Sequence, residues 1–201
     1  MSVRVRQLSH QEKNDRLYEI ADLRIKVFKE FPYIYDGSAQ YEVKYLERYI
    51  DAKDAAFIGA FVENDGEKMI GVATCLPLIQ EDDFVKKAFI KNGVNLEEIF
   101  YFGESVLLPE FRGQGIGHQF FDQREKYALS FNNIKKTTFC TVRRPDNHPL
   151  RPTNYRSLDV FWNSRGYFKN PEIRSQFSWQ DHGEKSETLK DMIYWLKEWN
   201  S

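Results

Sequence analysis

The stretch that decides the fold of this 201-residue chain is Arg112-Gly113-Gln114-Gly115-Ile116-Gly117. Three glycines at alternate positions weaken helices and strands alike. They favour a backbone that turns tightly and that a ligand can approach closely, because no side chains cover it. An apolar, strand-like run, Ser105-Val106-Leu107-Leu108, precedes them, and a helical pattern follows from about Ile116. A strand, a bare turn and a helix N-terminus together present unpaired N–H groups and a positive dipole end. The stretch therefore predicts a site for a phosphate or pyrophosphate.

The spacing of the glycines separates this site from the common nucleotide-binding loops. The chain lacks the G-x-x-x-x-G-K-[ST] pattern, and the third glycine of a dinucleotide-binding G-x-G-x-x-G would fall on His118. The segment instead resembles the acyl-coenzyme A loop of the GNAT N-acetyltransferase superfamily, [QR]-x-x-G-x-[GA], with Arg112, Gly115 and Gly117 at the fixed positions. Pro109-Glu110-Phe111 matches the proline, acidic residue and aromatic residue that usually precede that loop.

This resemblance implies acetyl-CoA as the cofactor and assigns the residues that would hold it. The run Val106, Leu107 and Leu108 matches the strand whose backbone pairs with the pantetheine arm. Arg112, at the first motif position, is expected to face the cofactor, with a plain surface charge as the alternative. The pyrophosphate loop then consists of Arg112, Gly113, Gln114, Gly115, Ile116, Gly117 and His118.

Composition favours one domain and excludes several partners. With 41% hydrophobic residues the chain can bury a sizeable core, and 29 Lys and Arg nearly balance 30 Asp and Glu. No overall field therefore favours nucleic acid or an anionic membrane, and the apolar runs are too short to span a bilayer. The first residues, 1–6, are expected to form a strand and not a signal peptide. Cys75 and Cys140 lie in strand-like runs and are expected to be buried free thiols in a reducing cytoplasm, with no metal-site spacing.

Hydrophobic periodicity predicts a single α/β domain over residues 1–201. The spacing of Leu189, Met192, Ile193 and Leu196 at i, i+3, i+4 and i+7 predicts a C-terminal amphipathic helix at about 184–199. Residues 63–67 are expected to form a hairpin turn. Strands are expected at 3–8, 55–63, 69–79, 100–108, 137–142 and 173–179, and helices at 17–28, 43–50, 116–131 and 158–165.

This order of elements is similar to that of the GNAT fold over nearly the whole chain. The resemblance implies a central mixed, mostly antiparallel sheet flanked by helices. Three parts depart from it: an extra segment at about 80–98, which is expected to form one helix, a long loop at 143–156, and the C-terminal helix, which would replace or supplement the usual last strand.

Glu104 is the side chain expected to carry catalysis. It lies in the run Tyr101-Phe102-Gly103-Glu104-Ser105-Val106, in the central strand that leads to the glycine loop. A carboxylate in a strand covered on both faces is costly unless it is paired or faces a cavity. Burial makes such a group hold a proton closer to neutral pH, which suits a general base, and several members of the resembled superfamily use a glutamate on this strand in that role. The alternative is a structural salt bridge to an arginine or lysine.

The general acid is not at its usual place. Many GNAT members carry a tyrosine four residues before the G-[FY] that ends the short helix, and here Gly166-Tyr167 puts Trp162 at that position. An indole N–H does not protonate a thiolate at neutral pH, so Trp162 is expected in the core or at the wall of the acyl pocket. The candidates that replace the tyrosine are Tyr155, or His148 with Asp146, in the long loop. Solvent is a further alternative.

The acceptor site is expected beside Phe31-Pro32-Tyr33-Ile34-Tyr35, since the connection between the first two helices borders it in the resembled fold. Phe31, Tyr33 and Tyr35 would form a rigid aromatic rim, with ordinary packing as the alternative. Acidic residues nearby favour a cationic acceptor, although a charged, solvated surface explains them equally well. These residues are Glu30, Asp36, Glu42, Glu47, Asp82 and Asp83.

These features favour a cytoplasmic, acetyl-CoA-dependent N-acetyltransferase in which a primary amine of a small molecule or peptide attacks the thioester directly. The alternative is a catalytically weak, GNAT-like module that holds acyl-CoA as a sensor or interaction protein. Trp162 favours that alternative and Glu104 opposes it. An interaction protein without a cofactor conflicts with the glycine loop. The expected partner is the amine substrate, a homodimer is left open, and no nucleic acid, membrane or metal is expected.

Overall fold

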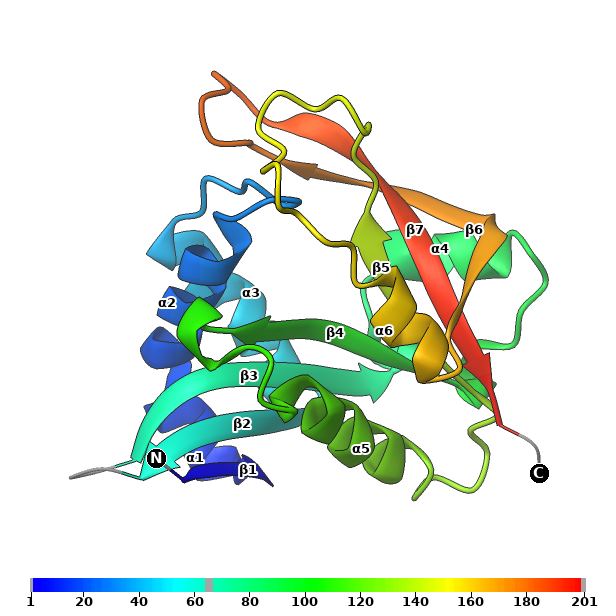
Figure 1. The fold of residues 1–201 in the computed structure, drawn as a ribbon. Coiled ribbons are helices and arrows are strands. Elements are labelled where there is room, and N and C mark those ends of the chain that lie inside the picture. The colour runs from blue at the N-terminus through cyan, green and yellow to red at the C-terminus, as the bar shows by residue number, and fades with distance from the viewer. Residues whose placement is uncertain (1, 64–66, 200–201) are drawn as a thin grey trace.

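The structure, a computed structural model, describes residues 2–63 and 67–199 and is built on a seven-stranded sheet in the order β1-β2-β3-β4-β5-β7-β6 (Figure 1). Every neighbouring pair is antiparallel except β4 and β5, which run parallel. The expected α/β class with a mixed, mostly antiparallel sheet is confirmed. The strands are β1 (Val3–Gln7), β2 (Ala56–Glu63), β3 (Glu67–Pro77), β4 (Ile99–Leu107), β5 (Lys136–Val142), β6 (Phe168–Trp179) and β7 (Thr188–Glu198).

Helices cover both faces of the sheet. One face, called the α2/α3 face below, carries α1 (His10–Asp15), α2 (Leu17–Phe28), α3 (Ala39–Asp51) and α4 (Asp83–Ile90). The other, called the α5 face, carries α5 (Ile116–Ala128) and α6 (Asp159–Ser164). Each face has its own buried core.

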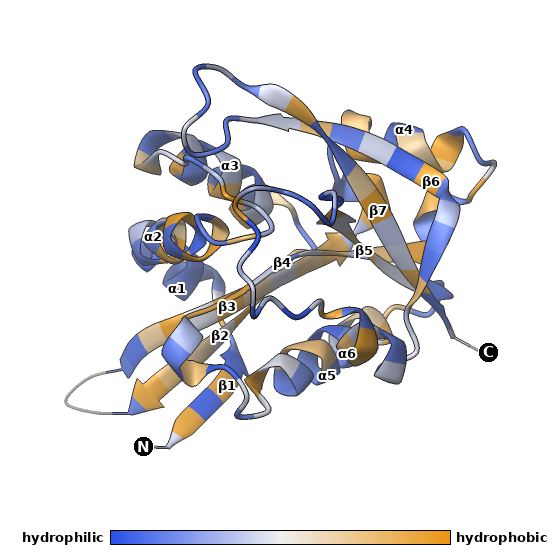
Figure 2. Cartoon of the chain, turned by 45° about the horizontal axis from the view of Figure 1, so that its top comes forward, coloured by the Kyte–Doolittle hydropathy of each residue, from blue (hydrophilic) through white to orange (hydrophobic). Residues whose placement is uncertain are grey.

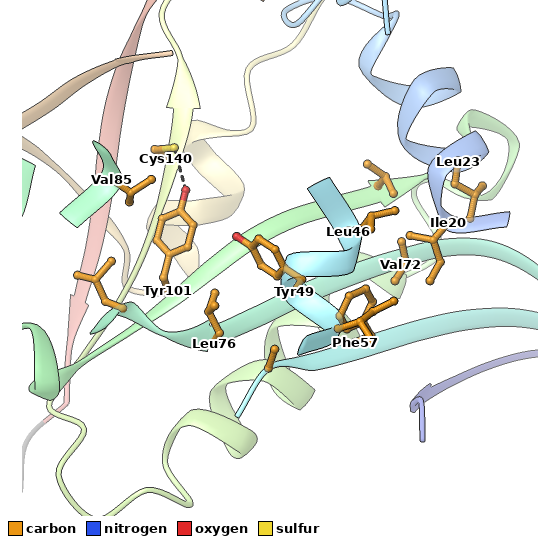
Figure 3. Packing of buried hydrophobic residues seen from close by; sticks show 14 of the residues in the cluster. Ile20, Leu23, Leu46, Tyr49, Phe57, Val72, Leu76, Val85, Tyr101 and Cys140 are labelled. Carbon is orange, nitrogen blue, oxygen red and sulfur yellow. Dashed lines mark hydrogen bonds between the residues drawn. The ribbon is translucent and has the colours of Figure 1, made fainter. Parts of the chain in front are cut away.

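The two cores follow from the strand patterns. On the α2/α3 face, Leu46 and Tyr49 of α3 pack over β3 and β4 (Figure 3), and on the α5 face Phe120 and Phe121 of α5 are buried. The edge strand β1 alternates between hydrophobic and hydrophilic residues along its length (Figure 2), as expected for a strand with one covered face. Strands β2 and β3 are almost wholly buried because helices lie on both of their sides.

Most predicted elements are present close to their expected ends, but α1 was missed. Its start is a capping box in which the Glu12 N–H donates to Ser9 Oγ and the Ser9 N–H donates to Glu12 Oε2, a signature that is visible in the sequence. The extra segment 80–98 contains a shorter helix than expected, α4, with single 3-10 turns at Leu78–Gln80 and Leu96–Glu98. The predicted turn at 63–67 lies largely outside the described residues.

The helix predicted at about 184–199 is wrong, because this segment forms β7. It pairs with β5 on one side and β6 on the other. The segment fits two periods: the helical spacing of its apolar residues noted above, and a strand-like alternation in which Lys190, Met192 and Tyr194 are all buried. Pairing with two neighbouring strands decides between them, and no short window of sequence contains that information.

Strands β4 and β5 separate after a short parallel pairing. Only residues 99–101 of β4 pair with residues 136–138 of β5. Beyond these pairs the two strands diverge (Figure 1). Within residues 2–63 and 67–199, β4 from Phe102 onward therefore has β3 on one side and an unpaired edge on the other. The glycine loop follows directly at the end of this edge, which places the predicted phosphate site and Glu104 on one strand.

Candidate active site

The glycine loop has the conformation that an anion site requires. Gly113 and Gly115 have φ angles of 76° and 80°, the left-handed region that favours glycine, and Gly115 is the N-cap of α5. A Cβ built on either residue meets no atom within 4 Å. Among the described residues, no backbone N–H from Gly113 to His118 has a hydrogen-bond acceptor. These N–H groups and the α5 dipole fit the pyrophosphate of acetyl-CoA.

The unpaired edge of β4 presents the backbone of alternate residues. In an antiparallel ladder, the N–H and C=O groups of successive residues point to opposite sides of the strand. The Leu108 N–H donates to Ile70 O at 3.0 Å, so the groups of Leu108 and Val106 face β3. Ser105 and Leu107 therefore face the unpaired edge. Of the three residues predicted to meet the pantetheine arm, Leu107 is the one so placed, and Ser105 was missed.

Arg112 braces the loop. Its Nε and Nη2 each donate to Leu107 O at 3.1 Å, and its Nη1 donates to Glu30 Oε2 at 2.7 Å. Glu30 follows the end of α2, so this side chain connects the cofactor loop to the predicted acceptor rim. The guanidinium is directed at protein groups in this structure, and its contact with the cofactor stays a prediction.

A β-bulge turns Glu104 towards the α2/α3 face. Ala73 pairs with Ser105 and Cys75 pairs with Phe102, so Gly103 and Glu104 together oppose the single residue Thr74. The extra residue shifts the side-chain alternation, which brings Glu104 to the helices α2 and α3. A side chain at Gly103 would not fit, because a Cβ there would lie 2.5 Å from Thr74 Oγ1.

Glu104 lies in a buried cluster with Arg24 and Glu42. Arg24 Nη1 is 2.6 Å from Glu104 Oε2 in an ion pair without hydrogen-bond alignment, and its Nε donates to Glu42 Oε2. The Arg24 guanidinium also lies over the Tyr45 ring, 4.3 Å from its centroid. Glu104 Oε1 and Glu42 Oε1 have no hydrogen-bond partner within the described chain. Two carboxyl groups thus share one guanidinium, and each keeps one oxygen able to accept from a ligand.

The structure brings the candidate acids to the predicted acceptor rim. The Tyr155 ring meets the Phe31 ring edge-on with centroids 4.6 Å apart, and the His148 ring lies 5.7 Å from the same phenylalanine. Burial raises the pKa of Tyr155, which keeps its phenol protonated at neutral pH. Asp146 instead pairs with Arg151 on the surface.

Tyr33 is half-buried, with its ring centroid 4.7 Å from that of Phe28 and 6.1 Å from that of Trp179. Burial raises its pKa, and Cys140, Tyr155 and Glu104 are among the groups that act on its hydroxyl electrostatically. Tyr35, in contrast, bridges to Asp181 at the β6–β7 hairpin and has a pKa raised by burial and by Glu42.

Arg144 holds the rim in place. It makes two hydrogen bonds to Asp181, at 2.6 and 2.8 Å, and donates to the carbonyls of Pro32 and Tyr33 at 2.8 Å each. Three segments that are distant in sequence, the α2–α3 connection, the long loop after β5 and the β6–β7 hairpin, meet at this one side chain. A buried, bidentate arginine fixes their relative positions.

Trp162 packs as a core residue on the α5 face. Its ring centroid lies 4.9 Å from that of Trp195 and 5.3 Å from that of Phe139. Phe139 stands on β5 where that strand leaves β4, so Trp162 is near the point of separation without touching Glu104's cluster. Its contact with an acyl group stays a prediction.

Sequence reasoning missed the charged partners of Glu104. Arg24 lies between Ile20 and Phe28 at spacings of four, on the apolar stripe of α2, and Glu42 lies four residues before the buried Leu46 of α3. A charge in an apolar stripe is the signal that could have found both. The other acidic residues near the rim are mostly paired, as in the ion pairs of Glu30, Asp82 and Asp83 with Arg112, Arg48 and Lys86.

Two further properties concern the chain as described. No three or more His, Cys, Asp or Glu side chains in residues 2–63 and 67–199 are grouped so that they could hold a metal ion. In the same ranges, no helix combines the length and apolar character needed to cross a membrane. Cys75 and Cys140 are free and buried, as predicted, and burial raises the pKa of each thiol to about 12.

Comparison with known proteins agrees with this geometry. The model of the acetyltransferase (GNAT) family matches residues 18–153, more than half of the chain. The chain therefore belongs to the GNAT acetyltransferase family. No curated protein sequence matches it.

Solved structures with the same fold are distant in sequence. NAA60 of Arabidopsis thaliana in complex with a bisubstrate analogue is 12% identical with a TM-score of 0.64, and covers 99% of this chain and 100% of its own. The ribosomal-protein-alanine N-acetyltransferase of Brucella melitensis is 14% identical, with a TM-score of 0.58 and coverage of 98% and 99%. PaiA N-acetyltransferase of Thermoplasma acidophilum, in complex with coenzyme A, is 13% identical, with a TM-score of 0.52 and coverage of 99% and 100%. At these identities the similarity shows the fold alone.

Proposed function

We propose that this protein is an N-acetyltransferase that moves the acetyl group of acetyl-CoA to a primary amine of a small molecule or peptide. The observation that carries the proposal is the position of Glu104. Its carboxyl group is buried, keeps Oε1 unpaired, and lies on the same strand edge that ends at the pyrophosphate loop. A base that lies beside the thioester position is what an amine acceptor requires.

The chain's own groups would divide the work as follows. When bound, acetyl-CoA supplies the acetyl group as a thioester. The N–H groups of 113–118 hold the pyrophosphate. The backbone of Ser105 and the N–H of Leu107, whose carbonyl already accepts from Arg112, hold the pantetheine arm along the unpaired edge. Glu104 Oε1 accepts a proton from the acceptor ammonium, which leaves a neutral amine able to attack. Arg24 keeps the carboxyl group in that orientation.

The acceptor would enter from the α2/α3 face, opposite α5. Phe31, Tyr33 and Tyr155 line the approach from two segments that Arg144 holds together. The cluster contains two carboxyl groups, those of Glu104 and Glu42, and one guanidinium, that of Arg24. It therefore has a net charge of −1 when both carboxyl groups are ionised. This negative charge favours an acceptor that arrives as a cation. Tyr155 stays protonated at neutral pH and is the candidate that returns a proton to the leaving thiolate.

Turnover of an amine panel tests this function. Purified protein is mixed with acetyl-CoA and, one at a time, with polyamines, aminoglycosides, amino acids and short peptides with free N-termini, and release of the coenzyme A thiol is followed. We expect thiol release that depends on the amine and an acetylated amine by mass spectrometry. Tight binding of acetyl-CoA without release for any amine would instead support the sensor reading that Trp162 favours.

A further inference from the structure

A buried arginine holds the backbone of the β4 bulge from the α5 face. Arg124 of α5 is 2% exposed, and its Nη1 donates to Glu104 O at 3.4 Å and to Thr74 O at 3.5 Å. Its Nε donates to Phe120 O, one turn earlier in the same helix, at 3.3 Å. The guanidinium therefore connects α5 to β3 and β4 at the position where the two strands depart from regular register.

The Arg124 guanidinium is buried without a carboxylate partner among the residues that the structure describes, and its hydrogen-bond acceptors are all backbone carbonyls. Glu125, which follows it in α5, pairs with other cations instead. The guanidinium lies over two aromatic rings, 4.4 Å from the centroid of Phe102 and 4.7 Å from that of Phe121. These contacts offset only part of the cost of removing a cation from water, and burial lowers the pKa of Arg124 accordingly. A role in the reaction explains why a cation is kept at this position.

The N–H and the C=O of Glu104 are both bound by side chains. Thr74 Oγ1 accepts from the Glu104 N–H at 3.3 Å, while Arg124 donates to the Glu104 carbonyl. On the other face of the sheet, Arg24 pairs with the carboxyl group of the same residue. Glu104 is thus fixed at its backbone from β3 and α5, and at its carboxyl group from α2.

We propose that Arg124 and Thr74 are positioning residues of the acetyl transfer, which fix the bulge so that the Glu104 carboxyl group stays on the α2/α3 face. This inference rests on the proposed function, in which Glu104 is the base. Side chains alternate between the two faces of a strand, so a bulge displaced by one residue would turn this carboxyl group towards α5. The hydrogen bonds of Arg124 to both strands oppose that displacement, because they form only while Thr74 and Glu104 stay opposite each other.

Variants of both residues test this role in two backgrounds, the wild-type chain and Glu104→Gln. Arg124→Met fills much of the same volume beside the aromatic rings but has no donor, whereas Arg124→Lys keeps a cation that can donate to one carbonyl. Thr74→Val is nearly isosteric and removes the acceptor of the Glu104 N–H, and it carries the comparison if Arg124→Met does not fold. Arg165→Met is the control, because Arg165 is a largely buried arginine of the same face that pairs with acidic residues of α5.

The comparison of the two backgrounds separates positioning from packing. If Arg124 acts through Glu104, Arg124→Met should lower kcat about 10–100-fold in the wild-type chain and less than about twofold in Glu104→Gln, where the base is already absent. Thr74→Val should depend on the background in the same way, with a smaller loss of kcat. Arg124→Lys should retain more activity than Arg124→Met, although methionine suits the aromatic surroundings better.

Acetyl-CoA binding and the control variant should be unaffected. In every variant, the KM for acetyl-CoA and the rise in melting temperature that acetyl-CoA causes should match wild type, and Arg165→Met should keep kcat within about twofold. A loss of kcat that is absent or equal in the two backgrounds, or Arg124→Lys no more active than Arg124→Met, would overturn the positioning role alone. A kcat of Glu104→Gln equal to that of wild type would overturn the proposed base, and the positioning role with it.

Discussion

Arg24 of α2 and Glu104 of β4 form an ion pair, with Arg24 Nη1 2.6 Å from Glu104 Oε2 and both side chains almost fully buried. The β4 bulge brings Glu104 to this position, and the apolar stripe of α2 carries Arg24 to it. The pair ties a helix beside the predicted acceptor rim to the strand that leads to the cofactor loop. The contribution of this ion pair to the stability of the fold can be tested separately from its role in catalysis.

Loss of Arg24 should destabilise the fold. Arg24→Met leaves Glu104 and Glu42 buried without a cation, and we expect the free energy of unfolding to fall by about 3–5 kcal/mol in urea denaturation at pH 7. Arg16→Met is the matched control, since Arg16 also pairs with a glutamate but is part-exposed, and its loss should cost at most about 1 kcal/mol. An equal decrease in the free energy of unfolding in the two variants would show that the buried ion pair stabilises the fold no more than the part-exposed one.

Glu104→Gln should separate binding from chemistry. The amide keeps the size of the side chain but no longer accepts a proton, so turnover should fall by about 10²–10⁴ while acetyl-CoA affinity is unchanged. The acid limb of the pH–rate profile should flatten with it. Glu110→Gln, on the exposed side of the loop, controls for loss of a nearby charge. A rate and profile equal to wild type would assign Glu104 to structure.

Gly115→Asp should abolish acetyl-CoA binding. It adds a side chain and a negative charge at the α5 N-cap, among the unpaired N–H groups. Wild-type protein should melt at a higher temperature with acetyl-CoA present, through mass action on the native state, and the variant should not. Gly93→Asp is the control, because Gly93 also has a positive φ, 65°, with open space around it and lies outside the loop. Equal affinities of wild type and Gly115→Asp in calorimetry would place the cofactor elsewhere.

The candidate acids in the long loop should not both be dispensable. We expect Tyr155→Phe or His148→Ala to lower kcat and kcat/KM together while acetyl-CoA affinity stays constant, as for a group that acts on thiolate departure. Tyr127→Phe, a tyrosine of α5 that packs on Phe100 and Phe131, is the control. If both loop variants have the same kcat and kcat/KM as Tyr127→Phe, and Trp162→Tyr does not raise the activity, the thiolate takes its proton from solvent.

Glu81 should make stability depend on pH. Its pKa is raised by burial from 4.5 to about 7, so the folded state holds the proton more tightly than the unfolded state. The contribution favours folding at low pH and is lost as the pH rises from about 4.5 through about 7. Relative to wild type, Glu81→Gln should therefore gain about 1–3 kcal/mol between pH 5 and pH 8, measured by urea denaturation at both values. A constant difference across this range would contradict the shift.

Much of the fold could be predicted from local patterns. The glycine loop, the strand before it and the helix after it follow from glycine chemistry and hydrophobic period, and the structure has them where the sequence places them. The prediction of secondary structure is wrong where the hydrophobic pattern fits a helical period and a strand period equally well. Residues 188–198 read as a helix in isolation and form β7 because β5 and β6 are there to pair with it.

The sequence by itself determined the loop that fits a pyrophosphate and the strand that carries Glu104, because both depend on neighbours in the chain. Only the tertiary structure decided what surrounds Glu104. The β4 bulge depends on the register with β3, and Arg24 and Tyr45 reach the carboxyl group from helices that are far from β4 in sequence. The charge and hydrogen-bond partners of a buried group come from every element packed against it, and a linear pattern does not contain those contacts.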